Sequence, residues 1–161
     1  MAAILKTIIF TLVLPCTIVV WAPWRWILPR GTRLDLGGAH ALGVLPFALG
    51  AAIYFWCAFW AFARVGGGTP APIDPPRRLV VHGLYRYVRN PMYWGVLLML
   101  AGETIAFESG VLLQYSVAVC VGFMLFVLLY EEPALRRKFG ADYEEYCRKV
   151  PRWLPRLTSK D

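Results

Sequence analysis

Polar side chains that can do chemistry gather in one short stretch of an otherwise apolar sequence, from His82 to Gly95. This stretch holds two arginines, a histidine, three tyrosines and an Asn-Pro turn, and it opens a hydrophobic segment. The acidic pair Glu131-Glu132 closes the next hydrophobic segment. Polar groups at the mouth of a membrane span are costly and usually functional. We therefore expect a binding or catalytic site where these two features meet.

The acidic pair requires a positive partner. Two carboxylates near the C-terminal end of a helix repel each other and the negative pole of the helix dipole. One interpretation is structural, with Arg136 or Arg86 as the partner, and the other is a bound cationic ligand. Pro133 disfavours helical geometry at Glu132, so we expect a kink that turns the pair away from the helix axis.

The elements that must position these residues are membrane-spanning helices. The chain is 58% apolar, against about 45–50% in soluble domains. Its uncharged runs at 7–24, 36–63 and 109–130 each reach the length that a bilayer requires. Residues 91–109 are also apolar but contain Glu103 and Glu108. We predict an all-α integral membrane protein, a single domain over 1–161, with about four transmembrane helices near 5–28, 37–63, 91–108 and 110–130.

Charge orients these helices. Five arginines lie in 64–90 and eight basic residues follow Tyr130, which predicts that both regions and both termini are cytoplasmic. The membrane would be a bacterial inner membrane or an equivalent one. A basic surface of this kind attracts anionic lipid headgroups. We expect no nucleic acid partner, because nothing in the chain resembles a nucleic acid reading module.

Metal and disulfide chemistry are not indicated. The four cysteines are scattered along the chain, and only two histidines are present, His40 and His82. No spacing typical of a disulfide framework or a zinc site follows. We read His40 as a packing residue, and Glu103 as either a buried acid bonded to a neighbouring helix or part of a substrate cavity.

The C-terminal part predicts two short amphipathic helices lying on the cytoplasmic face of the membrane. Gly140 would end the first, and Asp142 with Glu145 would form a capping box for the second. Ion pairs are expected at Glu144/Arg148 and Glu145/Lys149. The apolar positions that define this pattern are Leu135, Phe139, Tyr143, Tyr146 and Val150.

The start of the third hydrophobic segment is built for a helix N-terminus. Asn90 is a good N-cap and Pro91 suits the first turn, and the free N–H groups there suit a carboxylate. Gly83, next to the titratable His82, would let the backbone approach a ligand closely. Arg86 and Tyr87 are read as interfacial side chains.

Four motifs in order carry a resemblance to a known family. They are Gly83-Leu-Tyr85, Arg89-Asn-Pro-Met-Tyr-Trp-Gly95, Glu131-Glu132 and Phe139-Gly-Ala-Asp-Tyr-Glu-Glu-Tyr-Cys-Arg-Lys-Val-Pro151. The chain thereby resembles the membrane-embedded methyltransferase superfamily, which contains isoprenylcysteine carboxyl methyltransferases and phospholipid N-methyltransferases. The resemblance covers about half of the chain, and it implies a cytoplasmic cofactor apparatus at 77–95 and 131–157.

The resemblance implies S-adenosyl-L-methionine as cofactor, with no metal. The sulfonium, ammonium and ribose of this donor suit carboxylates, and its carboxylate suits a helix N-terminus. We expect Arg89 to act in catalysis by orienting the acceptor. The residues that the resemblance implies for cofactor binding are Leu79, Val80, His82, Gly83, Tyr85, Asn90, Pro91, Tyr93, Glu131 and Glu132.

Two departures from the family pattern bear on the substrate. Asn90 stands where the family usually has histidine. Phe126, Val127 and Leu128 stand where isoprenylcysteine enzymes carry an arginine, which disfavours a prenylcysteine acceptor. We expect a methyltransferase for a lipophilic or small amphipathic acceptor that enters from the bilayer. The alternatives are an NADPH-dependent membrane reductase of the sterol-reductase type, against which the acidic pair argues, and a non-catalytic membrane subunit.

Overall fold

The computed structural model describes residues 2–27, 34–66 and 78–156, and the regular secondary structure within these ranges is helical. No strand is formed within these ranges. The predicted all-α fold is confirmed. The glycines and prolines of the segment 66–76 predict an irregular loop, and its residues 67–76 lie outside the described residues.

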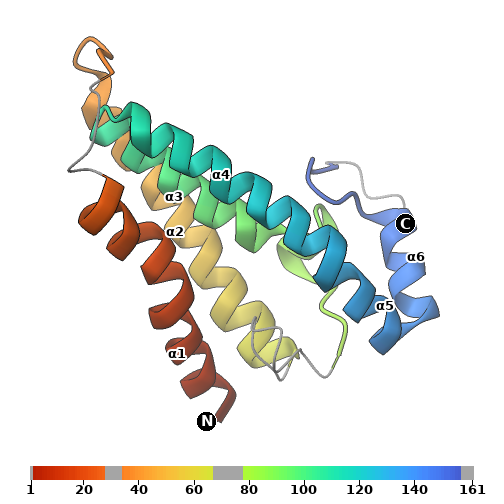
Figure 1. The fold of residues 1–161 in the computed structure, drawn as a ribbon. Helices are drawn as coiled ribbons and strands as arrows, with labels where there is room; N and C mark the ends of the chain where they lie inside the picture. Colours follow the sequence, from red (N-terminus) through yellow and green to blue (C-terminus); the bar gives the residue numbers. More distant parts are fainter. Residues whose placement is uncertain (1, 28–33, 67–77, 157–161) are drawn as a thin grey trace.

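Four long helices make the body of the molecule, and two short ones follow at one end (Figure 1). Three of the long helices continue into π-helical turns. Short 3-10 turns precede α2 (Ala39–Gly43) and α3 (Gly83–Arg86). The helices and their π-helical continuations are α1 (Ala2–Cys16, then Thr17–Trp21 and Pro23–Ile27), α2 (Val44–Phe55, then Trp56–Gly66), α3 (Pro91–Ala106), α4 (Gly110–Phe126, then Val127–Glu131), α5 (Glu132–Phe139) and α6 (Ala141–Lys149).

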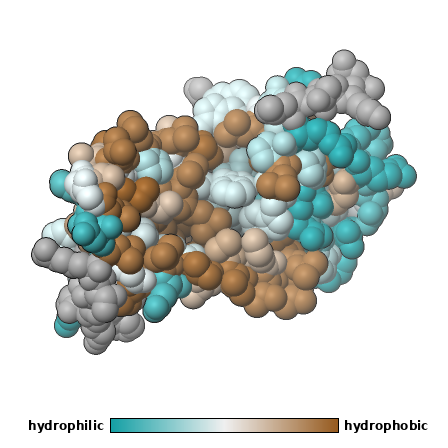
Figure 2. Space-filling view, turned by 90° about the horizontal axis from the view of Figure 1, so that it is seen from above, coloured by the Kyte–Doolittle hydropathy of each residue, from teal (hydrophilic) through white to brown (hydrophobic). Residues whose placement is uncertain are grey.

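Three helical stretches are long and apolar enough to cross a membrane: Ile8–Arg25, Ala39–Ala61 and Gly110–Phe139. The shorter α3 has 16 residues, about 24 Å at 1.5 Å per residue, against a hydrocarbon core of about 30 Å. It packs against both α2 and α4. On the face that Figure 2 shows, hydrophobic surface predominates over the long helices, whereas the α5–α6 end is mainly hydrophilic. These features confirm an integral membrane protein.

Small residues fix how α3 lies against α2. A Cβ atom added at Gly95 would lie 2.8 Å from the Gly50 carbonyl oxygen, and one at Gly102 would lie 2.6 Å from the Gly43 carbonyl oxygen. Glycines at these positions let the two backbones approach closely, as is common between membrane helices. The N-terminus of α3, where the conspicuous polar residues lie, is therefore held in a fixed position relative to α2.

The C-terminal helices follow the prediction in outline and differ from it in detail. Gly140 ends α5 with a φ of 53°, which favours glycine. The predicted capping box is wrong, since Gly140 is the N-cap of α6 and no side chain caps the helix. Glu145 pairs with Lys149 at 2.9 Å, as predicted. Glu144 pairs with Arg136 at 3.1 Å instead of Arg148, because α5 folds back beside α6.

Candidate functional site

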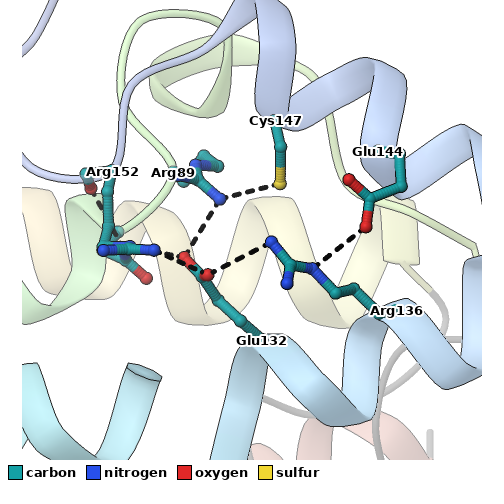
Figure 3. Close-up of polar contacts among 7 residues, drawn as sticks. Arg89, Glu132, Arg136, Glu144, Cys147 and Arg152 are labelled. Atoms are coloured by element: carbon teal, nitrogen blue, oxygen red, sulfur yellow. Dashed lines mark hydrogen bonds and ion pairs between the residues drawn. The ribbon is translucent and has the colours of Figure 1, made fainter. Parts of the chain in front are cut away.

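The two polar features that the sequence singled out meet at the hydrophilic end of the bundle. Nη1 of Arg89, just before α3, lies 3.0 Å from Oε1 of Glu132, the first residue of α5. Arg152, after α6, joins them through two hydrogen bonds to Glu132, from Nε at 2.6 Å and from Nη2 at 2.9 Å. One carboxylate thus joins three segments that are far apart in sequence (Figure 3).

This carboxylate is almost fully buried. Glu132 is 3% exposed, and the Arg89 side chain is 11% exposed. Hydrogen bonds between ionised groups are about twice as strong as neutral ones, and the two-point contact from Arg152 also fixes geometry. The hydrogen bond to Glu132 raises the pKa of Arg152 above its usual range. Removing one member of a buried pair leaves an uncompensated charge, so this cluster holds the end of the bundle together.

The structural interpretation of the acidic pair therefore applies to Glu132, with the expected Arg136 as a distant partner and with Arg89 and Arg152 as closer partners that were not expected. Arg136 lies 3.9 Å from Glu132 and pairs more closely with Glu144, at 3.1 Å. Arg86 is exposed and is not a partner of Glu132 among the described residues. The main partners are Arg89 and Arg152.

Glu131 has a separate environment. The Tyr93 hydroxyl donates a hydrogen bond to its Oε2 at 2.6 Å, and among the described residues Glu131 has no arginine, lysine or histidine within ion-pair distance. The Tyr93 ring lies 4.8 Å from that of Phe123 and 6.4 Å from that of Trp153, measured between centroids. The acidic pair is thus split, with one carboxylate bound by arginines and the other by the Tyr93 hydroxyl.

A π-helical turn brings about this split. Glu132 keeps helical dihedrals, with φ −60° and ψ −44°, so the expectation that Pro133 drives it out of helical geometry is wrong. Because Pro133 has no N–H, the Leu129 carbonyl lacks its α-helical donor, and the backbone widens into the π turn Val127–Glu131. The wider turn rotates Glu131 relative to the position that a regular α-helix would give it.

The segment after α6 lies across the start of α3. The backbone N–H of Arg89 donates to the Pro151 carbonyl at 2.9 Å, and the indole N–H of Trp94 donates to the Trp153 carbonyl at 2.8 Å. Asn90 is the N-cap residue of α3 and Pro91 follows it, as predicted, but the Asn90 side chain does not cap the helix. Its amide donates instead to the Arg152 carbonyl at 3.0 Å.

Several of the predicted cofactor contacts are buried in the core. Val80 and Tyr85 are buried in the main apolar cluster, and Pro91 is buried at the start of α3. Leu79 packs against the cluster formed by α6, whereas the side chain of His82 is exposed. The structure therefore brings together five of the predicted residues: Arg89, Asn90, Tyr93, Glu131 and Glu132. Residues 79–85 lie beside this group, but Leu79, Val80 and Tyr85 pack against other parts of the protein.

Gly83 has a structural reason to be glycine. Its φ is +61°, and a Cβ atom there would overlap the indole ring of Trp56, at the end of α2. The close approach that the sequence suggested is thus to a side chain of the protein itself. The Tyr146 hydroxyl donates to the Tyr85 carbonyl at 2.7 Å and ties α6 to this turn. Burial raises the pKa of Tyr146, so its hydroxyl stays protonated.

Sequence reasoning missed Arg152, Cys147 and Trp153. Nη1 of Arg89 also donates to the Cys147 sulfur at 2.7 Å, while Nε of Arg89 is buried and has no hydrogen-bond partner among the described residues. The sequence feature that could have pointed to Arg152 is its position directly after Val150-Pro151, the end of the fourth family motif. Within the ranges described, no group of three His, Cys, Asp or Glu side chains could hold a metal ion.

The chain matches a family model, curated relatives and a solved structure. The family model described as phospholipid methyltransferase matches residues 39–142, more than half of the chain. The probable protein-S-isoprenylcysteine O-methyltransferase of Oryza sativa subsp. indica is 36% identical over 82 residues, 51% of this chain and 43% of the relative. Methanethiol S-methyltransferase 2 of Bradyrhizobium diazoefficiens is 39% identical over 77 residues, 48% of this chain and 29% of the relative. The chain thus matches less than half the length of these relatives.

A solved structure shares the fold. The eukaryotic intramembrane Ras methyltransferase ICMT (isoprenylcysteine carboxyl methyltransferase) aligns with a TM-score of 0.54 at 19% identity, covering 93% of this chain and 52% of that one. At this identity the likeness concerns the arrangement of helices alone. The family match includes α2, α3, α4 and the acidic pair, and so covers most of the residues that build the site. The chain therefore belongs to the phospholipid methyltransferase family.

Proposed function

We propose that the protein is an integral membrane methyltransferase that uses S-adenosyl-L-methionine and acts on a lipophilic or small amphipathic acceptor. One observation carries the proposal beyond family membership. At the N-terminal end of α3, Arg89 lies beside Glu132, while the Tyr93 hydroxyl binds a second carboxylate, Glu131, that has no basic partner among the described residues. This arrangement offers a positive and a negative group side by side.

The residues present fit the donor. S-Adenosylmethionine supplies an electrophilic methyl group when bound, and its sulfonium is positive while its carboxylate is negative. Glu131 with Tyr93 suits the positive part. The Nε of Arg89 is buried and has no hydrogen-bond partner among the described residues. Its N–H suits a hydrogen-bond-accepting atom of S-adenosylmethionine or of the substrate that receives the methyl group. The proposal keeps the other predicted cofactor contacts, and the buried ones among them would support the residues that line the site. These contacts are Leu79, Val80, His82, Gly83, Tyr85, Asn90, Pro91 and Glu132.

Methyl transfer is an in-line displacement, so this chain contributes mainly by alignment and electrostatics. Arg89 is fixed by Glu132 and by the Pro151 carbonyl, and it can orient the acceptor without having to reorganise. The buried, apolar surroundings strengthen each charge interaction and keep water away from the reacting atoms. The acceptor would enter from the bilayer, since the surface of the body is hydrophobic (Figure 2).

The acceptor class and the topology follow as proposals. The relatives' names give a prenylated cysteine and methanethiol as acceptors, and both are lipophilic or small. The basic residues at the α5–α6 end support a cytoplasmic site with both termini on that side.

Transfer of labelled methyl groups tests the function. The purified chain in lipid nanodiscs is incubated with methyl-labelled S-adenosylmethionine and, in turn, a small thiol, an amphipathic carboxylate and a membrane lipid extract. We expect label in at least one acceptor class, loss of transfer in Arg89→Lys, and retention in Arg86→Lys, whose arginine is exposed. Failure of all acceptors, with no binding of the labelled donor, would refute the proposal.

A further inference from the structure

The first helical stretch carries a groove that the candidate site does not use. Its lining residues fall into two rows at multiples of four residues, so each row runs along the helix. One row includes Leu12, Val20 and Trp24, and the other consists of Thr17, Trp21 and Arg25. The cavity has a volume of about 670 Å³, within the range of about 300–1,000 Å³ that is typical of ligand sites.

Two features fix the shape of the helix along this groove. Beyond Cys16 the backbone widens into the π-helical turns Thr17–Trp21 and Pro23–Ile27. Pro23 is fully buried and has no N–H, so it cannot donate a hydrogen bond to the preceding turn. The Tyr115 hydroxyl donates to the Ile18 carbonyl of that turn at 3.0 Å. The groove is therefore part of a helix that α4 holds in its widened form.

The groove lies away from the candidate site. Tyr115, which holds this helix, is in the second turn of α4, whereas the acidic pair follows the other end of α4. The Arg25 end of the groove thus lies at the end of the bundle opposite α5 and α6 (Figure 1). From Leu12 to Arg25 the groove is about 20 Å long at 1.5 Å per residue. This length is comparable with one leaflet of a hydrocarbon core about 30 Å thick.

Charge and aromatic rings gather at the Arg25 end. The Arg25 side chain is exposed, and no carboxylate of the described residues lies within ion-pair distance of it. Trp21 and Trp24 are 52% and 69% exposed, and tryptophan favours the boundary between hydrocarbon and headgroups. Leu12 and Val20, farther along the groove, are exposed apolar side chains. An occupant should be apolar over the length of one leaflet and negative at the boundary.

We propose that this groove binds one anionic phospholipid, with its phosphate at Arg25 and an acyl chain along Leu12 and Val20. A guanidinium group matches the geometry of a phosphate and binds it through two hydrogen bonds. A zwitterionic phospholipid has the same phosphate, but its own ammonium group compensates the charge and is repelled by Arg25. The site is independent of the proposed function, since it lies in the leaflet opposite the candidate site.

Competition between two phospholipids tests the charge. The full chain is released for native mass spectrometry from micelles that contain equal amounts of phosphatidylglycerol and phosphatidylcholine with identical acyl chains. A basic residue at the membrane surface contributes about 5-fold in affinity for an anionic lipid, the equivalent of about 1 kcal/mol. We expect the wild-type chain to retain phosphatidylglycerol in preference to phosphatidylcholine. We expect Arg25→Gln to bind one phosphatidylglycerol about 5-fold more weakly.

A second pair of variants tests the groove without changing a charge. Val20→Trp places a large side chain in the groove and should remove one bound phosphatidylglycerol although Arg25 remains. Val13→Trp is the matched control, because Val13 is 62% exposed on the same helix and does not line the groove. It should leave lipid binding unchanged. Both valines are exposed, so neither change disturbs the core, and thermal unfolding of the two variants checks this.

The same spectra decide between the possible occupants. Equal retention of the two lipids by the wild-type chain would overturn the proposal. Retention of phosphatidylglycerol that is unchanged in Arg25→Gln, or in Val20→Trp, would overturn it as well. A wild-type dimer that dissociates in Val20→Trp but not in Val13→Trp would assign the groove to a second copy of the chain instead of a lipid.

Discussion

Replacement of Glu132 by glutamine removes the one negative charge that Arg89 and Arg152 share, and keeps the size of the side chain. Breaking a buried ion pair by removing one partner costs about 3–5 kcal/mol. The Arg152 side chain is 36% exposed, so water compensates part of its charge. We therefore take the lower end and expect Glu132→Gln to reduce the free energy of unfolding by about 3 kcal/mol.

This loss is large enough to measure. For a chain of this size, 1 kcal/mol shifts the melting temperature by about 2–4 °C, so Glu132→Gln should lower it by roughly 6–12 °C. Thermal unfolding in detergent, followed by tryptophan fluorescence, gives the shift. Glu145→Gln is the control, since Glu145 pairs with Lys149 at 2.9 Å with both side chains more than half exposed. A pair of this kind contributes about 1 kcal/mol or less.

The two variants together decide whether Glu132 is structural. If Glu132→Gln melts within about 3 °C of Glu145→Gln, the charge cluster does not stabilise the end of the bundle. The division of the acidic pair would then lose its physical basis.

The remaining predictions concern the fold, the acceptor and the topology. Gly83→Ala should destabilise the protein by more than about 1–2 kcal/mol, because alanine is strained at φ +61° and its Cβ would displace Trp56. Gly122→Ala, which meets open space, should not, and chemical unfolding of both shows the difference. Prenylcysteine analogues should be poor acceptors because the turn before the acidic pair is apolar, and robust methylation of a farnesylated cysteine would contradict this. Single cysteines at Thr69 and Ser159 should react only from the cytoplasmic side, and labelling from the opposite side would reverse the topology.

Rules that act over a few residues predicted much of this molecule. The apolar runs gave the helices because each needs only its own sequence to span a bilayer. Pro91 starts α3 and Gly140 ends α5 where their backbone preferences require. The Glu145–Lys149 pair follows from helical spacing alone.

Interactions between distant segments could not be predicted in this way. Arg152 lies 20 residues from Glu132, and only the fold of α5 against α6 brings the two together. The apparent ligand contact at Gly83 is a contact with Trp56, 27 residues earlier in the chain. The split of the acidic pair depends on the π turn Val127–Glu131. Neighbouring side chains of a helix point in different directions, and a π turn changes those directions from the ones that a regular α-helix would give.

The central claim, a membrane methyltransferase that uses S-adenosylmethionine, is tested most directly by equilibrium binding. The purified wild-type chain in detergent is titrated calorimetrically with S-adenosylmethionine and, separately, with NADPH. We predict saturable binding of S-adenosylmethionine and none of NADPH, because Glu131, which has no basic partner among the described residues, offers a carboxylate that suits a sulfonium and repels phosphate. Saturable binding of NADPH without binding of S-adenosylmethionine would contradict the claim and favour a membrane reductase.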